Sequence, residues 1–299
     1  MRMDGQDESS NVEDVRGMSG RRGGGIGFPI GGRGIGIGTV AVALIAGWIF
    51  GINPLTILGM AGDGGGGEVV QRAPEGPAPA PPAGDAQAKF VSQVLRSTEV
   101  VWTQAFAESG KTYQPPKLKL FSGSYGTACG QGQAAMGPFY CPNDGGVYID
   151  LGFYRTLEQK LNSPGEFAKA YVIAHEVAHH VQNQLGVMKR VDQMRQRGSE
   201  AQSNALSVRV ELQADCFAGV WAKRSQSVEK GWRLEAGDIE AGLNAASQIG
   251  DDNLQKRGQG MVVPESFTHG SSAQRVGWFK RGFETGDPDR CNTFESRDL

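Results

Sequence analysis

The sequence predicts an α+β protein, mainly helical with a small sheet, preceded by a single transmembrane helix. Three observations predict this class. Apolar side chains recur at three-, four- and seven-residue spacings in several stretches after residue 88, which is typical of helices. Two short runs, KLKLFSG and VYIDLGF, flank a loop rich in glycine and read as strands. Finally, residues 35–60 contain no charged side chain and are long enough to cross a bilayer.

The chain divides into four predicted parts. Residues 1–33 mix charges of both signs with glycine runs, so we expect a disordered cytoplasmic tail. Residues 34–60 form the predicted transmembrane helix, and residues 61–87 a Gly/Pro-rich linker. Residues 88–299 then form the folded domain.

The flanking charges of residues 34–60 predict the orientation. Arg16, Arg21, Arg22 and Arg33 precede this segment, whereas the next basic residue after it is Arg72. The positive-inside rule therefore predicts an N-terminus in the cytoplasm and a folded domain on the outer side of the membrane. A cleaved signal peptide and a buried globular helix are alternatives, disfavoured by the long polar N-region and by the flanking glycines.

The folded domain is expected to start with a helix from about Lys89 to Ser109. Residues 117–123 and 147–153 are expected to be strands, and the second of them is our candidate for an edge strand that aligns a substrate. A central helix is expected to begin at the capping box of Ser163 and Glu166 and to stop at Gly186. Further helices are expected at about 200–223 and 239–249, followed by a loop and a short amphipathic helix within residues 268–287.

The four cysteines are an even number, which suits an oxidising compartment. No CxxC spacing is present, which argues against a zinc ribbon. Of the three pairings that four cysteines permit, we favour Cys129 with Cys141, because it closes a short loop, and Cys216 with Cys291. Four reduced, buried cysteines are the alternative.

The central helix carries the motif HExxH. Residues four apart lie on one helix face, so His175 and His179 can direct their ring nitrogens at one cation. Glu176 is rotated about 100° from His175, where it can reach a water on the open side of the metal. His180 points away from this face and is expected to have a polar role without coordination.

Two nitrogens do not complete a catalytic zinc site, which needs a third protein ligand and one open position. Gln182 and Leu185 replace the later residues of the HExxHxxGxxH pattern, so that pattern is excluded. Glu211 and Asp215 lie four apart on the next long helix. One of these carboxylates can bind the metal while the other orients a ligand histidine.

With these residues, the sequence resembles the gluzincin group of zinc metallopeptidases, in which HExxH is followed by ExxxD on a later helix. The stretches AHEVAHHVQNQLG, VRVELQADCFAGVWA and THGSSAQRVGWFKRGF look like the bacterial "putative neutral zinc metallopeptidase" family of membrane-anchored proteins. The resemblance covers most of residues 89–296. It implies a zincin-like metallopeptidase domain, with Glu211 as the third ligand and Asp215 as the orienting carboxylate; the reverse assignment is the alternative.

The resemblance implies a membrane-anchored hydrolase that cleaves a peptide or protein substrate by a metal-activated water, with one Zn²⁺ per chain and Glu176 as general base. It implies a single-pass protein of the bacterial cytoplasmic (inner) membrane, with the catalytic domain on the outer, periplasmic side. The net charge of −2 gives no reason to expect a nucleic-acid partner.

The oxyanion formed during hydrolysis needs additional donors, which His269 or Arg275 could supply. An ordinary surface histidine and a salt-bridged arginine are the alternatives for these two residues. Two other functions stay open: a zinc-stabilised binding or assembly module of the cell envelope without turnover, and a zinc amidase that acts on cell-wall peptide. The intact Glu176 argues against the first, because a structural site has no use for that acid.

Overall fold

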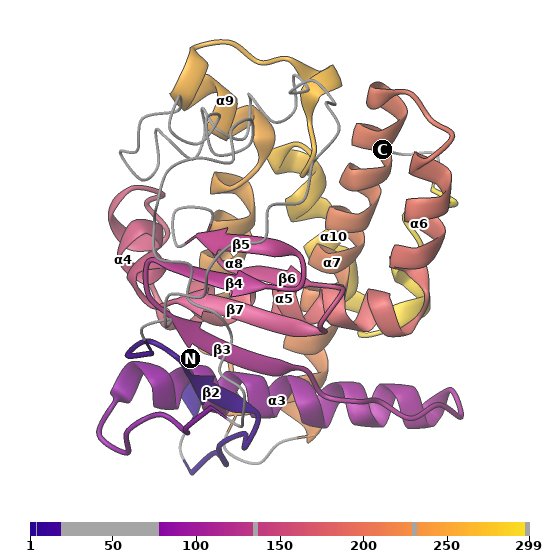
Figure 1. The fold of residues 1–299 in the computed structure, drawn as a ribbon. Coiled ribbons are helices and arrows are strands. Elements are labelled where there is room, and N and C mark those ends of the chain that lie inside the picture. The colour runs from indigo at the N-terminus through magenta and orange to yellow at the C-terminus, as the bar shows by residue number, and fades with distance from the viewer. Residues whose placement is uncertain (4, 19–77, 134–136, 229–231, 297–299) are drawn as a thin grey trace, which may run out of the picture.

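The computed structural model describes residues 1–3, 5–18, 78–133, 137–228 and 232–296. Helices dominate it and surround a small mixed sheet (Figure 1). The sheet has the strand order β2-β3-β7-β6, formed by Val12–Asp14, Lys117–Phe121, Gly146–Asp150 and Phe139–Cys141. The pairs β2–β3 and β3–β7 are parallel, and β6–β7 is antiparallel. The helical and strand parts of the prediction therefore recur in the fold.

The predicted transmembrane helix is not supported, and the predicted architecture is wrong in this respect. Among the described residues, no helix is both long and apolar enough to cross a membrane. The predicted segment, 34–60, lies outside the described residues. A single crossing between residues 18 and 78 would also place β2 and its partner β3 on opposite sides of the bilayer, although the two strands are hydrogen-bonded neighbours.

Residues 1–3 and 5–18 belong to the fold, which corrects the predicted disordered tail. Strand β1 (Arg2–Met3) pairs with β8 (Trp232–Arg233), and β2 forms one end of the sheet. The buried carboxylate of Glu99 accepts hydrogen bonds from Ser9 and Asn11. A composition that suggested disorder is thus ordered by partners some ninety residues away in the chain.

Helix α3 (Ala86–Glu108) begins where the sequence predicts, because Asp85 caps it by accepting the backbone N–H groups of Gln87 and Ala88. The central helix α5 (Glu166–Gln184) is capped differently from the prediction. Its N-cap is Gly165 at φ 107°, and the Ser163 hydroxyl donates to Leu161 instead. The predicted stop is confirmed, since Gly186 adopts a left-handed conformation with φ 75°.

The centre of the molecule is α5, which packs against α3, α7 (Glu200–Val228), α8 (Asp238–Gln248) and the sheet. Apolar residues all around α5 are fully buried, as expected for a helix enclosed on every side. Shorter helices surround this centre: α4 (Gly152–Gln159), α6 (Val187–Arg195) and α9 (Asp251–Gln259), with the 3₁₀ turns η2 (Pro264–Ser266) and η3 (Pro288–Cys291). The sequence analysis missed these short elements and the hairpin β4–β5 (Ser124–Thr127, Gly130–Gln133).

Helices α7 and α10 (Ser272–Thr285) approach each other unusually closely. A Cβ atom at Gly219 would lie 2.1 Å from the Phe279 carbonyl oxygen, and one at Gly282 would lie 1.9 Å from that of Cys216. Only glycine therefore permits this crossing. The close contact sets the position of α10 over α7, and with it the position of the first turn of α10.

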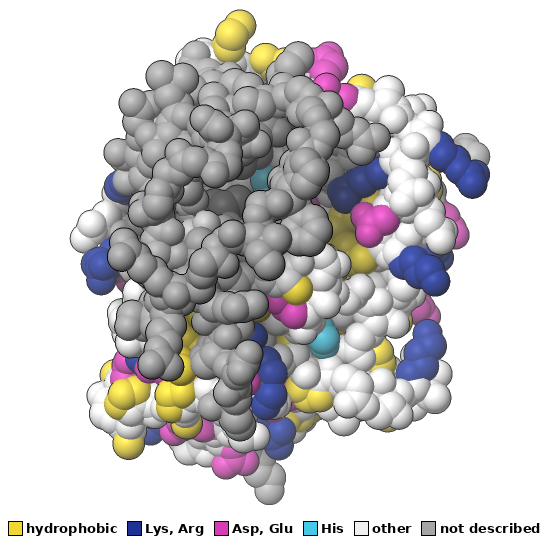
Figure 2. All heavy atoms as spheres, viewed as in Figure 1, with side chains coloured by type: hydrophobic (Ala, Val, Ile, Leu, Met, Phe, Trp, Pro, Cys, Tyr) yellow, Lys and Arg dark blue, Asp and Glu magenta, His cyan; other side chains and the backbone are white. Residues whose placement is uncertain are grey.

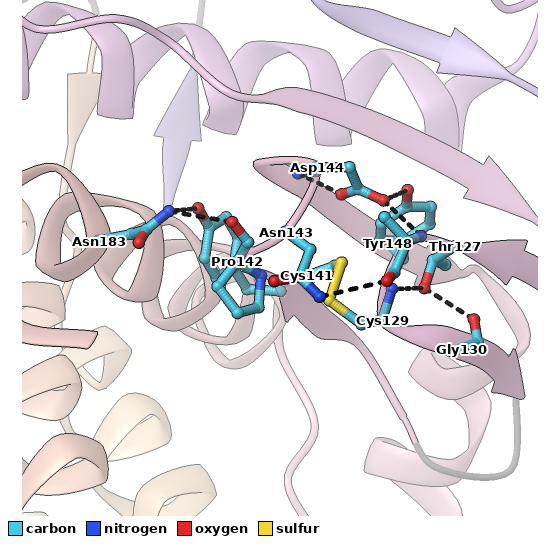
Figure 3. Close-up of a disulfide and its surroundings, with 12 residues drawn as sticks. Thr127, Cys129, Gly130, Cys141, Pro142, Asn143, Asp144, Tyr148 and Asn183 are labelled. Carbon is cyan, nitrogen blue, oxygen red and sulfur yellow. Dashed lines mark hydrogen bonds between the residues drawn. A yellow bond between two sulfur atoms is a disulfide. The ribbon is translucent and has the colours of Figure 1, made fainter. Parts of the chain in front are cut away.

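Two disulfides link distant parts of the fold, in the pairing that the sequence favoured. Cys129–Cys141 joins the β4–β5 hairpin to β6 (Figure 3). The adjacent loop is held by Asn143, which donates to Ala128, and by Asn183 of α5, which donates to the Pro142 carbonyl. Cys216–Cys291 fastens η3 to α7 across a sequence separation of 75 residues.

In the same view drawn with all atoms, Lys and Arg side chains lie among Asp and Glu side chains on the visible described surface around α6 and α10 (Figure 2). Charges of both signs are thus intermingled on that part of the surface.

Candidate metal centre

Helices α5 and α7 bring three potential metal ligands together: His175, His179 and Glu211. One ligand atom from each lies within 4.8 Å of the other two. The Glu211 carboxylate lies between the imidazoles, with Oε2 3.1 Å from His175 Nε2 and Oε1 3.5 Å from His179 Nε2. Glu211 is therefore the carboxylate that faces both histidines, and Asp215 lies behind one of them.

Both imidazoles are oriented from behind through Nδ1. His175 Nδ1 is 2.9 Å from Asp215 Oδ1, and His179 Nδ1 is 2.8 Å from the Gln182 side-chain oxygen. An N–H at Nδ1 that donates to these acceptors leaves the lone pair at Nε2, which is the nitrogen that faces Glu211. Two imidazole nitrogens and one carboxylate, with the ring orientations fixed, form a donor set that fits zinc.

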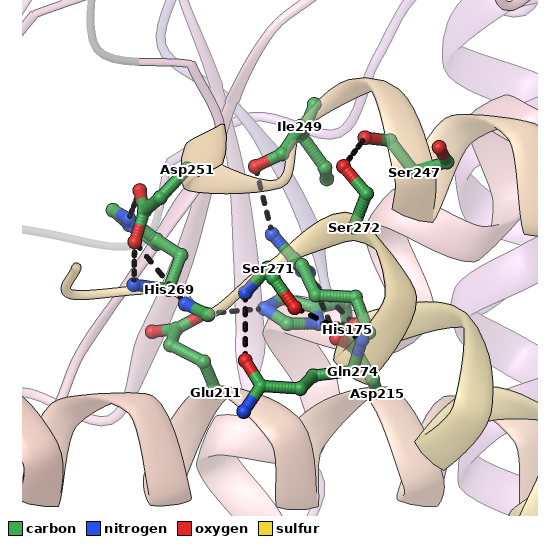
Figure 4. A network of polar contacts seen from close by, with 12 residues as sticks. His175, Glu211, Asp215, Ser247, Ile249, Asp251, His269, Ser271, Ser272 and Gln274 are labelled. Atoms are coloured by element: carbon green, nitrogen blue, oxygen red, sulfur yellow. Dashed lines mark hydrogen bonds and ion pairs between the residues drawn. The ribbon is translucent and has the colours of Figure 1, made fainter. Parts of the chain in front are cut away.

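Asp215 is fully buried, and its carboxylate is surrounded by donors (Figure 4). Besides His175, it accepts hydrogen bonds from the Tyr171 hydroxyl at 2.5 Å and from Arg275 Nε and Nη2 at 2.8 and 2.9 Å. Burial alone would raise its pKa, but the charges of Arg275 and His175 lower the pKa of Asp215 overall. Asp215 thus remains an anion behind the ligand histidine.

Arg275 lies in the first turn of α10, which the glycine contact places over α7. It is buried, and besides Asp215 it donates to the Ile249 carbonyl. Its guanidinium is therefore occupied on the far side of His175 from Glu211. Of the two roles that the sequence left open, the salt bridge is the one that the structure shows.

The charges of the site are strongly coupled. Burial lowers the pKa of His175, but the neighbouring Asp215 carboxylate raises this pKa overall, to about 10. Burial would raise the pKa of Glu211, but His179 and His175 hold it well below its usual range. In the metal-free chain, a proton therefore lies between His175 and Glu211, where a cation would bind.

Glu176 is 8% exposed, and its carboxyl group makes no hydrogen bond with any residue that the structure describes. Burial raises the pKa of Glu176 above its usual range, an effect that His179 and His175 offset in part. A buried acid without a hydrogen-bonding partner contributes nothing obvious to stability. The charges of His179, His175 and Glu211 all act on Glu176, so it lies near the three potential ligands; its predicted role as general base stays a prediction.

His269 lies in the loop before α10, and Figure 4 shows it beside Glu211. Asp251, the first residue of α9, holds this loop: one carboxylate oxygen accepts the backbone N–H groups of residues 268–270, and the other lies 3.2 Å from His269 Nδ1. Burial lowers the pKa of His269, but the Asp251 carboxylate raises it overall. The side chain is still 43% exposed, so it faces solvent as well as the site.

His180 lies outside the metal cluster, as helix geometry predicts. Its Nε2 donates to the Gln114 carbonyl at 2.7 Å, and its Nδ1 is 3.1 Å from the Tyr140 hydroxyl. Tyr140 belongs to β6, the strand at the end of the sheet next to β7. The predicted edge strand is therefore wrong, because residues 146–150 of β7 lie between β3 and β6; among the described strands, β6 ends the sheet.

Three residues of the site escaped the sequence analysis. Tyr171 precedes His175 by four positions and Gln182 follows His179 by three, so helical spacing was a usable signal for both. Asp251 had no such signal, because it contacts His269 from another element. Acidic residues in a helical first turn, here Asp251 and Asp252, are more often explained by the helix dipole.

Comparison with known proteins agrees with this geometry. A family model described as "Putative neutral zinc metallopeptidase" matches residues 1–294. The chain is 51% identical over 296 residues to "Uncharacterized protein YpfJ" of Escherichia coli, covering 98% of this chain and 99% of that protein. It is 45% identical over 195 residues to "Uncharacterized protein Rv2575" of Mycobacterium tuberculosis, covering 62% and 65% of the two chains. No solved structure matches the chain.

Proposed function

Because the chain belongs to the family described as "Putative neutral zinc metallopeptidase", we propose that it hydrolyses peptide bonds with zinc held by His175, His179 and Glu211 and with Glu176 as general base. One observation carries the proposal. Both imidazole Nε2 atoms face the Glu211 carboxylate, while each Nδ1 is occupied by a separate partner. Such an arrangement orients ligands before any metal binds.

Three protein ligands suit a catalytic zinc, whereas structural sites have four. When bound, zinc would act as a Lewis acid that polarises a carbonyl and makes water more acidic. The chain's own residues must then move protons. Glu176 is the candidate, because it lies beside the ligands without a hydrogen-bonding partner among the described residues and burial raises its pKa towards neutrality.

In this proposal Glu176 takes the proton of the attacking water and later delivers it to the leaving amine. His269 donates a hydrogen bond to the oxygen on which negative charge develops. Asp251 supports this role by accepting the Nδ1–H of His269, so that Nε2 is directed away from Asp251, and by raising the pKa of His269, which favours the protonated donor. Arg275 is not part of this step, since Asp215 occupies it.

The strand β6 is now the better candidate for aligning a substrate, because it is the edge of the sheet and packs against α5. An extended peptide can add to an open edge through backbone hydrogen bonds. The hydrogen bonds of Tyr140 with His180 and Asn183 tie this strand to the motif-bearing helix. A substrate on β6 would therefore be held in fixed register with the metal ligands.

The alternative of an envelope module without turnover is less well supported, because it gives no role to Glu176, whose carboxyl group has no hydrogen-bonding partner in the described part of the chain. The zinc amidase stays a prediction. The two disulfides support an oxidising compartment, and the predicted inner-membrane location stays a prediction.

The test uses the full chain and a diverse peptide library. We expect cleavage by the zinc-loaded protein, loss of cleavage after chelation, and recovery when zinc is added back. Glu176→Gln should lower cleavage by ~10²-fold or more. The control Glu166→Gln changes an exposed glutamate of the same helix and should cleave like wild type. Cleavage that survives both chelation and Glu176→Gln would refute the proposal.

A further inference from the structure

The two candidate histidine ligands have different partners behind them. His175 is backed by an anion, Asp215, whereas His179 is backed by a neutral amide, that of Gln182. Gln182 is fully buried and lies at the turn that follows His179 on α5. A neutral amide can face an imidazole with either its oxygen or its NH₂ group. The orientation of the Gln182 amide must therefore be fixed by its other hydrogen bonds.

A backbone carbonyl of α7 fixes the orientation of the Gln182 amide. Gln182 Nε2 lies 2.8 Å from the Val210 carbonyl oxygen of α7, and that oxygen can only accept. The amide nitrogen must therefore face Val210, which leaves the amide oxygen facing His179 Nδ1. That oxygen also can only accept, so Nδ1 must carry the proton and Nε2 the lone pair.

The side-chain amide of Gln213 also fixes the orientation of the Gln182 amide. The remaining N–H of Gln182 donates to Gln213 Oε1 at 3.0 Å, and Gln213 Nε2 donates to the Cys291 carbonyl at 3.0 Å. Reversal of the Gln213 amide would bring its oxygen against the Cys291 carbonyl. Cys291 is itself held by its disulfide to Cys216 on α7.

We propose that Gln182 and Gln213 are positioning residues that set the tautomer and ring orientation of His179, with the carbonyls of Val210 and Cys291 as the fixed ends of the relay. The inference rests on the proposed zinc site and adds to it the reason why His179 presents Nε2. It also links the metal centre to the C-terminal segment, because Cys291 belongs to η3.

A purely structural role for the glutamines, as ties between α5 and α7, predicts a different set of results. Such ties would change the stability of the metal-free protein but not the character of the metal site. The test therefore reads zinc affinity, the ligand-field spectrum of the cobalt(II)-substituted protein, and the tautomer of His179 by ¹⁵N NMR of the histidine-labelled, zinc-loaded full chain. None of these depends on peptide cleavage.

The central variant is Gln182→Met, which keeps the length of the side chain and removes the acceptor. We expect zinc to bind about 10- to 100-fold more weakly, as is typical when the partner of a ligand histidine is lost. Gln182→Glu also presents an acceptor to Nδ1–H, but its other oxygen would face the Val210 carbonyl, which cannot donate, so it should recover zinc affinity only in part. Gln213→Met should weaken zinc binding less, because Val210 still holds Gln182.

The matched control is Gln226→Met, which changes another glutamine of α7; among the described residues, its side chain donates to a carbonyl one turn back in its own helix. It should bind zinc like wild type. The proposal would be overturned if Gln182→Met had the zinc affinity and the cobalt(II) spectrum of wild type. It would also be overturned if the ¹⁵N NMR spectrum of the wild-type protein placed the His179 proton on Nε2. If Gln182→Met fails to fold, the wild-type NMR spectrum and Gln182→Glu still decide. If wild type binds no zinc, the proposed function fails first, which separates the two failures.

Discussion

At the scale of single residues, the site is defined by what lies behind each ligand. Tyr171 and Arg275 keep Asp215 ionised, and Asp215 in turn orients His175. The partner of His179 is uncharged. The anionic partner raises the pKa of His175, so this imidazole holds a proton in the metal-free chain.

Zinc binding should be coupled to proton release. The pKa of His175 is raised to about 10, so at pH 7 this imidazole must lose its proton before Nε2 can bind a metal. We expect the zinc association constant to rise about tenfold for each pH unit between pH 7 and pH 9. Calorimetry in buffers of different ionisation enthalpy measures the released protons, and an affinity independent of pH over this range would contradict the expectation.

The pairing of Asp251 with His269 makes a separate prediction. Asp251→Asn removes the charge that raises the pKa of His269, so the basic limb of the pH–rate profile should move to lower pH and kcat should fall, by less than the ~10²-fold expected for His269→Ala. The control is Asp252→Asn, which changes the next residue and its bond to Ser272. If the two variants gave the same pH profile, His269 would not act through Asp251.

At the scale of elements, the position of the site depends on the contact between α7 and α10. Gly282→Ala would push a methyl group into the Cys216 carbonyl, so we expect a loss of about 3 kcal/mol in the free energy of unfolding. Gly277→Ala, on the same helix but with no atom within 4 Å of its added Cβ, should instead stabilise by about 0.5–1 kcal/mol. Urea unfolding of both variants measures the difference, and similar effects of the two would contradict the packing argument.

The elements also show what could be predicted from the sequence. The central helix was predictable because its apolar residues and its HExxH motif lie within one local pattern. The cap at Gly165 and the interior place of β7 depend on tertiary contacts that no local pattern encodes. The same applies to β2, whose partner β3 follows it by about a hundred residues.

At the scale of the whole molecule, the N-terminal residues complete the fold. The free amino group of Met1 lies 3.2 Å from Glu235 Oε2 and 3.0 Å from Asp238, and β1 pairs with β8 beside it. Composition suggested a disordered tail because it counts charges without their partners. Here the amino group of Met1 is paired with residues that lie more than two hundred positions away, and Arg16 is paired with Asp14 and Asp85.

The amino group of Met1 therefore contributes to stability in a defined pH range. Burial lowers its pKa, but Asp238 and Glu235 raise it overall above the usual value of about 8. The stabilisation is thus complete below pH 8 and is lost as the pH rises through the folded-state pKa. N-terminal acetylation should cost less than ~1 kcal/mol at pH 7 and nothing at a pH well above that pKa. Equal thermal unfolding of acetylated and free chains at pH 7 would contradict this contribution.

Within one cluster of side chains, Glu211 is assigned to metal binding and Glu176 to proton transfer. The most direct measurement determines zinc content and peptide cleavage on the same samples of wild type, Glu176→Gln and Glu211→Gln. We predict that Glu176→Gln keeps one zinc per chain and loses cleavage, while Glu211→Gln loses both. Full cleavage by zinc-loaded Glu176→Gln, or stoichiometric zinc in Glu211→Gln with unchanged affinity, would contradict the account.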